Sequence, residues 1–236
     1  MNKIFRAVTV GVSACCMAAP LLAELAIQRP AQVSHTERVS LAPAGTVRLE
    51  DSFGDLYIEG WDQPAVEITF IQEMLDYKAP KNVSEQLERV RVTATQPSAD
   101  EVKISTAIPS HNFFRHPFGG KGDVNLRYEL RVPRDSHVII SDHGGGNILM
   151  DNVTGSIDAK NRDGDIVLFL PGPGPYPIDA RSKMGTVISE LSGKAHVQHV
   201  IGEKFTGTDE SGAHPIHLRV GFGGITIKEM PHEAVP

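Results

Sequence analysis

Five segments of the sequence repeat one short pattern, and this pattern constrains the fold more than any other feature. Each copy has apolar residues at alternate positions, a polar turn that ends in glycine, and a second apolar run. Alternation with a period of two is typical of β-strands, so each copy predicts two short strands joined at a glycine. The copies begin at residues 47, 139, 157, 178 and 216, and their glycines follow seven positions later, at Gly54, Gly146, Gly164, Gly185 and Gly223.

The spacing of the copies predicts how they stack. Gly146 and Gly164 lie 18 residues apart, Gly155 divides this step, and the next step of 21 residues includes a Pro/Gly-rich run at 171–177. Repeats of nearly constant length predict the coils of a β-solenoid, with one strand on each side of a coil. The glycines, Gly155 included, are expected at corners, where positive φ costs other residues energy. An antiparallel sandwich or meander with regular turns is the alternative.

The alternation also predicts which side chains face the core. Between residues 65 and 133 the strands are longer, with charged outer faces, and we expect a sheet that widens or caps the solenoid, with a short helix near 82–89. The expected fold is therefore an all-β solenoid, or β-helix, over residues 38–228, with a flexible segment at 24–37 and a tail at 229–236. The inward residues are expected to be Ile157, Ala159, Ile166, Leu168, Val187, Leu218, Ile225 and Ile227.

The first 23 residues have the features of an export signal. Lys3 and Arg6 precede an uncharged apolar run that ends at Ala23, which predicts a signal peptide cleaved after that residue. A lipoprotein signal that ends at Cys15 and an uncleaved anchor are the alternatives, although 17 residues are short for a membrane span. The expected location is across the inner membrane: periplasmic, on the outer surface or secreted.

Charge and cysteine content exclude several classes of function. Both cysteines, Cys15 and Cys16, lie in the predicted signal, so the mature protein is expected to have no disulfide and no cysteine site. Without Lys3 and Arg6, the 23 basic residues fall to 21 against 29 acidic ones, which changes the formal net charge from −6 to −8. The sequence has no basic stripe of the kind that binds nucleic acid.

The motifs resemble those of a bacterial protein family. The stretch from Gly54 to Asp62, the Leu-Arg-Val-Pro sequence at 130–133 and the glycine repeats from 146 to 187 resemble bacterial "putative adhesin" domains. These DUF4097-like proteins are related to the head domain of an auto-transporter adhesin. The resemblance covers roughly residues 38–228 and implies a right-handed β-solenoid of the cell envelope, with an envelope polysaccharide or a surface protein as partner. It implies no catalytic residues.

Metal sites and cofactors are not expected. The histidine pairs at 196/199 and 214/217 have a spacing that places two strand residues on opposite faces, so neither pair is a chelate. The acidic corner residues lack the paired glycines of calcium-binding repeats. We expect that Asp55, Asn147, Asp165 and Thr186 instead bond neighbouring backbone groups.

The remaining candidates concern carbohydrate chemistry and partner binding. Asp158 and Asp179 recur at equivalent outward positions beside Lys160 and Arg181, which leaves a carbohydrate-active β-helix enzyme as the alternative to a non-catalytic module. A Gly/Pro-rich loop carries the partner-binding candidates; the alternative is that its aromatic rings cap the solenoid. Trp61 is expected to be a packing residue. The partner-binding candidates are Phe113, Phe114, Arg115 and Phe118.

Overall fold

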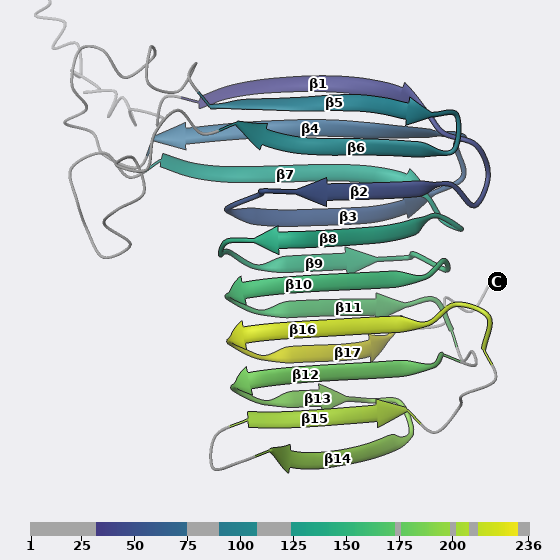
Figure 1. Ribbon diagram of the computed structural model, residues 1–236, viewed down its shortest axis with the longest axis vertical. Helices are drawn as coiled ribbons and strands as arrows, with labels where there is room; N and C mark the ends of the chain where they lie inside the picture. Colours follow the sequence, from purple (N-terminus) through teal and green to yellow (C-terminus); the bar gives the residue numbers. More distant parts are fainter. Residues whose placement is uncertain are drawn as a thin grey trace, which may run out of the picture.

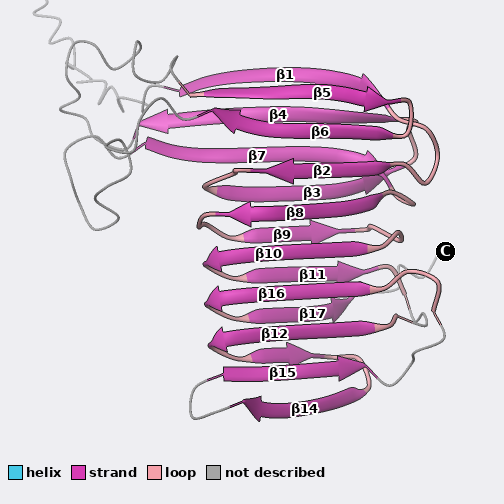
Figure 2. Ribbon diagram, in the orientation of Figure 1, coloured by secondary structure: helices cyan, strands magenta, loops and turns pink. Residues whose placement is uncertain are grey.

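The computed structural model describes residues 32–74, 90–107, 124–172, 176–198, 202–207 and 212–230, and all regular elements among them are β-strands (Figure 2). The strands form two mixed sheets, A and B. In spatial order, sheet A contains β1 (Gln32–Ser40), β4 (Ala65–Met74), β7 (Val124–Pro133), β3 (Asp55–Trp61), β9 (Ile148–Asp151), β11 (Ile166–Leu170), β17 (Ile225–Glu229) and β13 (Val187–Ser189). Sheet B contains β14 (Gly193–Gln198), β15 (Gly202–Gly207), β12 (Ile178–Met184), β16 (Ile216–Phe222), β10 (Ile157–Asp163), β8 (His137–His143), β2 (Thr46–Glu50), β6 (Glu101–Ala107) and β5 (Arg91–Ser98).

Each copy of the sequence repeat forms one unit of two strands, the first in sheet B and the second in sheet A. The units are β2–β3, β8–β9, β10–β11, β12–β13 and β16–β17, and adjacent units pair in parallel in both sheets. Like residues lie side by side, as Ile157 does with Ile216. All eight residues predicted to face inward are buried in the single hydrophobic cluster that both sheets share, which confirms the prediction.

The units do not stack in chain order, which departs from the expected solenoid. The last unit, β16–β17, lies between β10–β11 and β12–β13 (Figure 1). All units share the same pattern of apolar residues and glycine. The last unit can therefore form backbone hydrogen bonds with β10 as well as the next unit in sequence, β12–β13, could. The described chain therefore forms two mixed sheets and not a regular series of coils.

Antiparallel strands flank the parallel block at both ends. The strands β1, β4 and β7 pair antiparallel at one end of sheet A, as do β5 and β6 in sheet B, while β14, β15 and β12 do so at the other end. The longer strands expected between residues 65 and 133 are thus present. Strand β1 begins at Gln32, before the expected start of the domain at residue 38. The predicted signal at 1–23 and the helix near 82–89 lie outside the described residues.

The corner glycines form a column at the edge where the chain passes from sheet B to sheet A. Gly54, Gly146, Gly164, Gly223 and Gly185 all have positive φ, from 107° to 152°. A Cβ on Gly164 would lie 2.3 Å from the carbonyl oxygen of Gly146, and the other members have equivalent contacts with their neighbours. Gly155 is not among the positive-φ glycines, but a Cβ there would lie 2.0 Å from the oxygen of Ser136.

Candidate functional site

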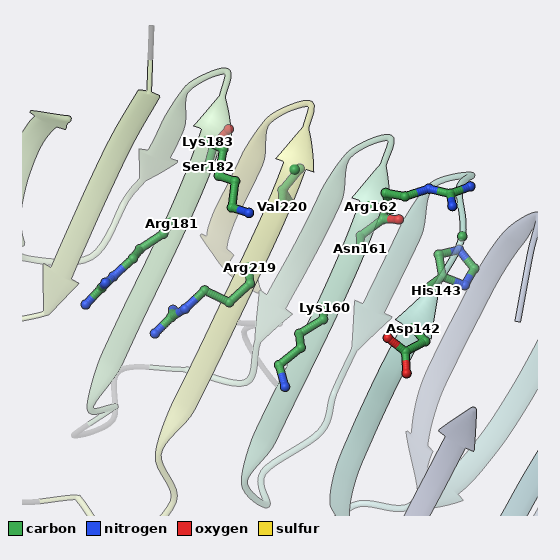
Figure 3. Close-up of a pocket in the computed structure, with 12 residues that line it drawn as sticks. Asp142, His143, Lys160, Asn161, Arg162, Arg181, Ser182, Lys183, Arg219 and Val220 are labelled. Atoms are coloured by element: carbon green, nitrogen blue, oxygen red, sulfur yellow. The ribbon is translucent and has the colours of Figure 1, made fainter. Parts of the chain in front are cut away.

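A hollow of about 640 Å³ lies on the outer side of sheet B, over the ends of β8, β10, β16 and β12 that lead into the glycine corner (Figure 3). Five cationic side chains line it, together with one carboxylate, that of Asp142. In Figure 3, Lys160, Arg219 and Arg181 point the same way from three adjacent strands. The cationic residues are Lys160, Arg162, Arg181, Lys183 and Arg219.

The alternation of the strands explains why cations gather there. Lys160, Arg219 and Arg181 are paired across β10, β16 and β12, so they form one outward row. Arg162 and Lys183 follow two residues further along their strands, while Gly221 takes this position in β16. Since Gly221 has no side chain, the sheet surface is open between the two cations. A Cβ at Gly221 would lie 2.5 Å from the carbonyl oxygen of Arg162.

Asp179 holds two of the cations in place. Its carboxylate accepts from Arg181 Nε at 3.2 Å and from Arg219 Nη2 at 2.9 Å, and Lys204 Nζ lies 3.9 Å away. Burial alone would raise the pKa of Asp179, but the hydrogen bond from Arg181 and the charges of Arg219, Arg181 and Lys204 outweigh it and lower the pKa. Asp179 is therefore a carboxylate that positions guanidinium groups.

The other cations of the hollow keep their charge available to a ligand. Lys160, Arg162 and Lys183 form no salt bridge with any described residue. Lys160, Arg162 and Lys183 are also exposed. Asp142 in the lining and Asp179 beside it therefore offset only part of the positive charge of the five cations.

His143 is buried behind the hollow. Its side chain is fully buried, and its Nδ1 atom lies 2.7 Å from Ser52 Oγ in a hydrogen bond. Burial lowers the pKa of His143 to about 4, although the backbone of Gly54 and the charge of Asp55 favour the protonated ring. His143 is thus neutral at physiological pH and adds no charge to the site. Asn161 and Ser182 take the matching inward positions in β10 and β12.

Three of the four polar corner residues predicted to bond backbone groups do so; the fourth, Thr186, accepts a bond from Ile225 N through its backbone oxygen and not its side chain. The Oδ1 atoms of Asp55, Asn147 and Asp165 accept hydrogen bonds from the backbone nitrogens of Asn147, Asp165 and Gly224, at 2.7 to 3.1 Å. Because these side-chain oxygens accept bonds from the backbone, they are not arranged as a calcium site. Among the described residues, no group of three or more acidic, histidine or cysteine side chains could hold a metal ion.

A second hollow, of about 430 Å³, lies on the outer side of sheet A and is predominantly acidic. Glu59 and Asp151 are paired across β3 and β9, and burial together with the charge of Glu59 raises the pKa of Asp151, against the opposing charge of Arg134. Arg131 Nε donates to Glu59 Oε2 at 3.1 Å. The two outer faces of the protein therefore carry hollows of opposite charge.

The structure brings together only some of the residues selected from the sequence. Asp158 and Asp179 share a row of sheet B, with His217 between them, but neither lines the hollow. Since Asp179 is held as a carboxylate, it is not available as a general acid. Trp61 donates from Nε1 to the oxygen of Ala65 at 2.8 Å and packs under Arg38, as expected of a packing residue.

Some residues selected from the sequence lie outside the described residues, and some residues of the hollow were not selected from the sequence. Phe113, Phe114, Arg115 and Phe118 lie outside the described residues, as does His199. Sequence reasoning missed Arg162, Lys183 and Arg219 as site residues. The alternation within each repeat indicates that all three side chains point outward, but only the spatial order of the strands shows that they lie together.

The described residues contain no helix long and apolar enough to span a membrane.

No protein-family model and no curated protein matches the sequence. Among solved structures, a "putative cell adhesion protein" from Clostridium sporogenes is 13% identical, with a TM-score of 0.46, over 84% of this chain and 100% of that chain. A "putative adhesin" from Bacteroides fragilis is 9% identical, with a TM-score of 0.33, over 86% of this chain and 99% of that chain. Similarities of this size assign neither a family nor an activity to the chain.

Proposed function

We propose that the protein is a non-catalytic, adhesin-like binding module of the bacterial cell envelope, which binds an anionic ligand in the hollow of sheet B. The observation that carries this proposal is the set of five cations around Gly221, against the single lining carboxylate of Asp142. The predicted signal at 1–23 supports an envelope location. The ligand is an anionic group of the envelope, whether phosphate, sulfate or carboxylate.

The electrostatics of the hollow support binding more than scaffolding. The whole chain has a formal net charge of −6, so a cationic hollow is a local exception and focuses the field at one place. Arg181 and Arg219 are held by Asp179 before a ligand arrives, which reduces the entropy lost on binding. Guanidinium groups also bind phosphate and carboxylate in a bidentate way.

The test is calorimetric titration with two soluble probes, heparin and polygalacturonate, at low and at physiological salt. The triple variant Lys160→Gln, Arg162→Gln, Lys183→Gln removes the cations that form no described salt bridge. We expect it to weaken binding by on the order of tenfold or more at low salt, because each exposed charge contributes about 0.5–1 kcal/mol.

The matched control is Arg91→Gln, Lys194→Gln, Lys228→Gln, which removes the same charge from exposed positions on β5, β14 and β17. Equal losses in both triple variants would show that only net charge matters, and the site would be rejected. Unchanged binding in the first variant would reject it as well.

Two parts of the proposal rest on sequence reasoning. We propose that the Phe113–Phe118 loop forms a second contact with the partner, so that changing its three phenylalanines to serine should abolish binding and leave the urea midpoint unchanged.

We also propose that the units are coils wound with a right hand. The strong preference for right-handed crossovers between parallel strands supports this winding.

The alternative, a carbohydrate-active enzyme, is favoured by one observation on sheet A. Glu59 and Asp151 are paired on adjacent strands, so their backbone positions are about 5 Å apart. This spacing allows their carboxyl groups to lie at the roughly 5 Å separation of retaining glycosidases. The raised pKa of Asp151 suits a proton donor. Loss of sugar release from envelope polysaccharide in an Asp151→Asn variant would establish it, and absence of release by the unchanged protein would exclude it.

A further inference from the structure

Two large apolar side chains are exposed beside the hollow. Phe222 at the end of β16 and Met184 at the end of β12 are paired across the two strands, and they are 54% and 43% exposed. Each directly follows the row that contains Gly221 and Lys183. The two side chains do not line the hollow, but they are exposed at the strand ends next to it, on the side of the glycine corner.

The apolar pair is confined to the two strands that carry Arg219 and Arg181. In β10, the position paired with Phe222 is Asp163, which is exposed and acidic, so the apolar pair does not extend to this strand. Phe222 and Met184 are also the only described pair among the exposed large apolar residues that face each other across a strand pairing. Exposed apolar side chains beside a group of cations are typical of surfaces that dock on membranes or partners.

We propose that this edge docks onto a bilayer that contains anionic phospholipid, with Phe222 and Met184 entering the acyl boundary and the cations of the hollow contacting the phosphates. The inference rests on the proposed anion binding and names its ligand. Phe222 and Met184 lie three residues beyond Arg219 and Arg181, which is about 10 Å along a strand. The apolar pair and this row of cations therefore reach different depths, as the layers of a bilayer surface require. Lys and Arg side chains can extend from an apolar boundary toward phosphate.

Charge complementarity favours the bilayer and sets one orientation. Each cation near an anionic membrane adds about fivefold to affinity before salt screening, so Lys160, Arg162 and Lys183 together contribute on the order of a hundredfold. The acidic hollow of sheet A, which includes Glu59 and Asp151, would be repelled by the same surface. Within the described part of the chain, the edge beside sheet B is therefore the one that faces lipid.

The experiment is co-sedimentation of the purified protein with phosphatidylcholine vesicles, with and without about one third phosphatidylglycerol. The unchanged protein should bind only the anionic vesicles. The double variant Phe222→Ser, Met184→Ser should bind them at least about tenfold more weakly, because it removes roughly half-exposed Phe and Met surface that the bilayer would bury. It should bind heparin as before. Ile188→Ser, which changes an exposed apolar residue of sheet A, should bind the vesicles normally.

A second measurement places the side chains directly. Phe222→Cys labelled with an environment-sensitive dye should shift to shorter wavelength with anionic vesicles, and Ile188→Cys should not. If the double variant binds vesicles as well as the unchanged protein, or the unchanged protein binds heparin but no vesicles, the bilayer inference is overturned while anion binding stands. If the triple charge variant keeps its affinity for heparin, the proposed function itself fails.

Discussion

His143 makes the stability of this fold depend on pH in a window that can be calculated. Its ring is fully buried against Ser52, and its pKa falls from 6.5 to about 4. In the unfolded chain the ring returns to water and binds a proton at the higher pKa. Between the two values the unfolded state therefore holds more protons, so stability rises with pH there and is lost as pH falls.

The magnitude follows from the two pKa values. Linkage gives a loss of about 2 kcal/mol in the free energy of unfolding between about pH 7 and about pH 4.5, and about 3 kcal/mol once the pH is below both values. The perturbation is His143→Asn. Asparagine already occupies the paired position in β10, where Asn161 Nδ2 donates to the carbonyl oxygen of Gly146 at 2.8 Å. The variant is therefore expected to fold without a titrating group at this site.

The assay is urea unfolding followed by circular dichroism at the two pH values. Carboxylates also titrate in this window, so the quantity of interest is the difference between the variant and the unchanged protein. His143→Asn should reduce the pH-dependent loss by about 2 kcal/mol, whereas His217→Asn, on the exposed face of the same sheet, should not. If His143→Asn and the unchanged protein lose the same free energy of unfolding between the two pH values, the conclusion that the buried ring is neutral would be refuted.

Three further predictions test the corner and the hollow. Gly164→Ala should lower the free energy of unfolding by about 2–4 kcal/mol, because φ is 110° and the new Cβ would lie 2.3 Å from a carbonyl oxygen. Gly172→Ala, where φ is 65° and the space around the new Cβ is open, should lower it by only about 1 kcal/mol in the same urea assay. Asp165→Ala should cost about 1 kcal/mol through the lost bond to Gly224, and Asp165→Asn should be close to neutral. Asp179→Asn should tighten heparin binding a few-fold in calorimetry, since it removes the carboxylate that offsets Arg181, Arg219 and Lys204; weaker binding would show that positioning matters more than charge.

Much of the fold could be predicted because it depends on local geometry. A period of two determines which side chains face inward, and Ile157, Ala159 and Leu168 are accordingly buried. Corner glycines such as Gly164 adopt the positive φ that a tight change of direction needs. The corner positions of Asp55 and Asn147 were predictable in the same way, although the backbone groups that they bond belong to neighbouring units.

The candidate site could not be predicted in this way, since its residues come from strands that are distant in sequence. Lys160 and Arg219 are 59 positions apart but are direct partners across β10 and β16. The alternation of side chains along a single strand predicts that both point outward, but it does not show which strands are adjacent. The match of Lys160 with Arg181 was visible in the sequence, whereas the Arg219 and Gly221 that complete the hollow depend on the position of the last unit.

The insertion of β16–β17 between earlier units has a physical reason at the corner. Its inward residue Val220 lies between Asn161 and Ser182, which bond the carbonyl oxygens of Gly146 and Gly223. An apolar residue needs no such bond, so this unit fits between two polar ones without leaving a buried group unpaired. The antiparallel strands β14 and β15 pair onto β12 and occupy its free edge, which leaves the edge of β10 for the last unit. The hollow, with Arg219 and Gly221 at its centre, is therefore a product of the out-of-order stacking and would not exist in a solenoid whose coils followed the chain.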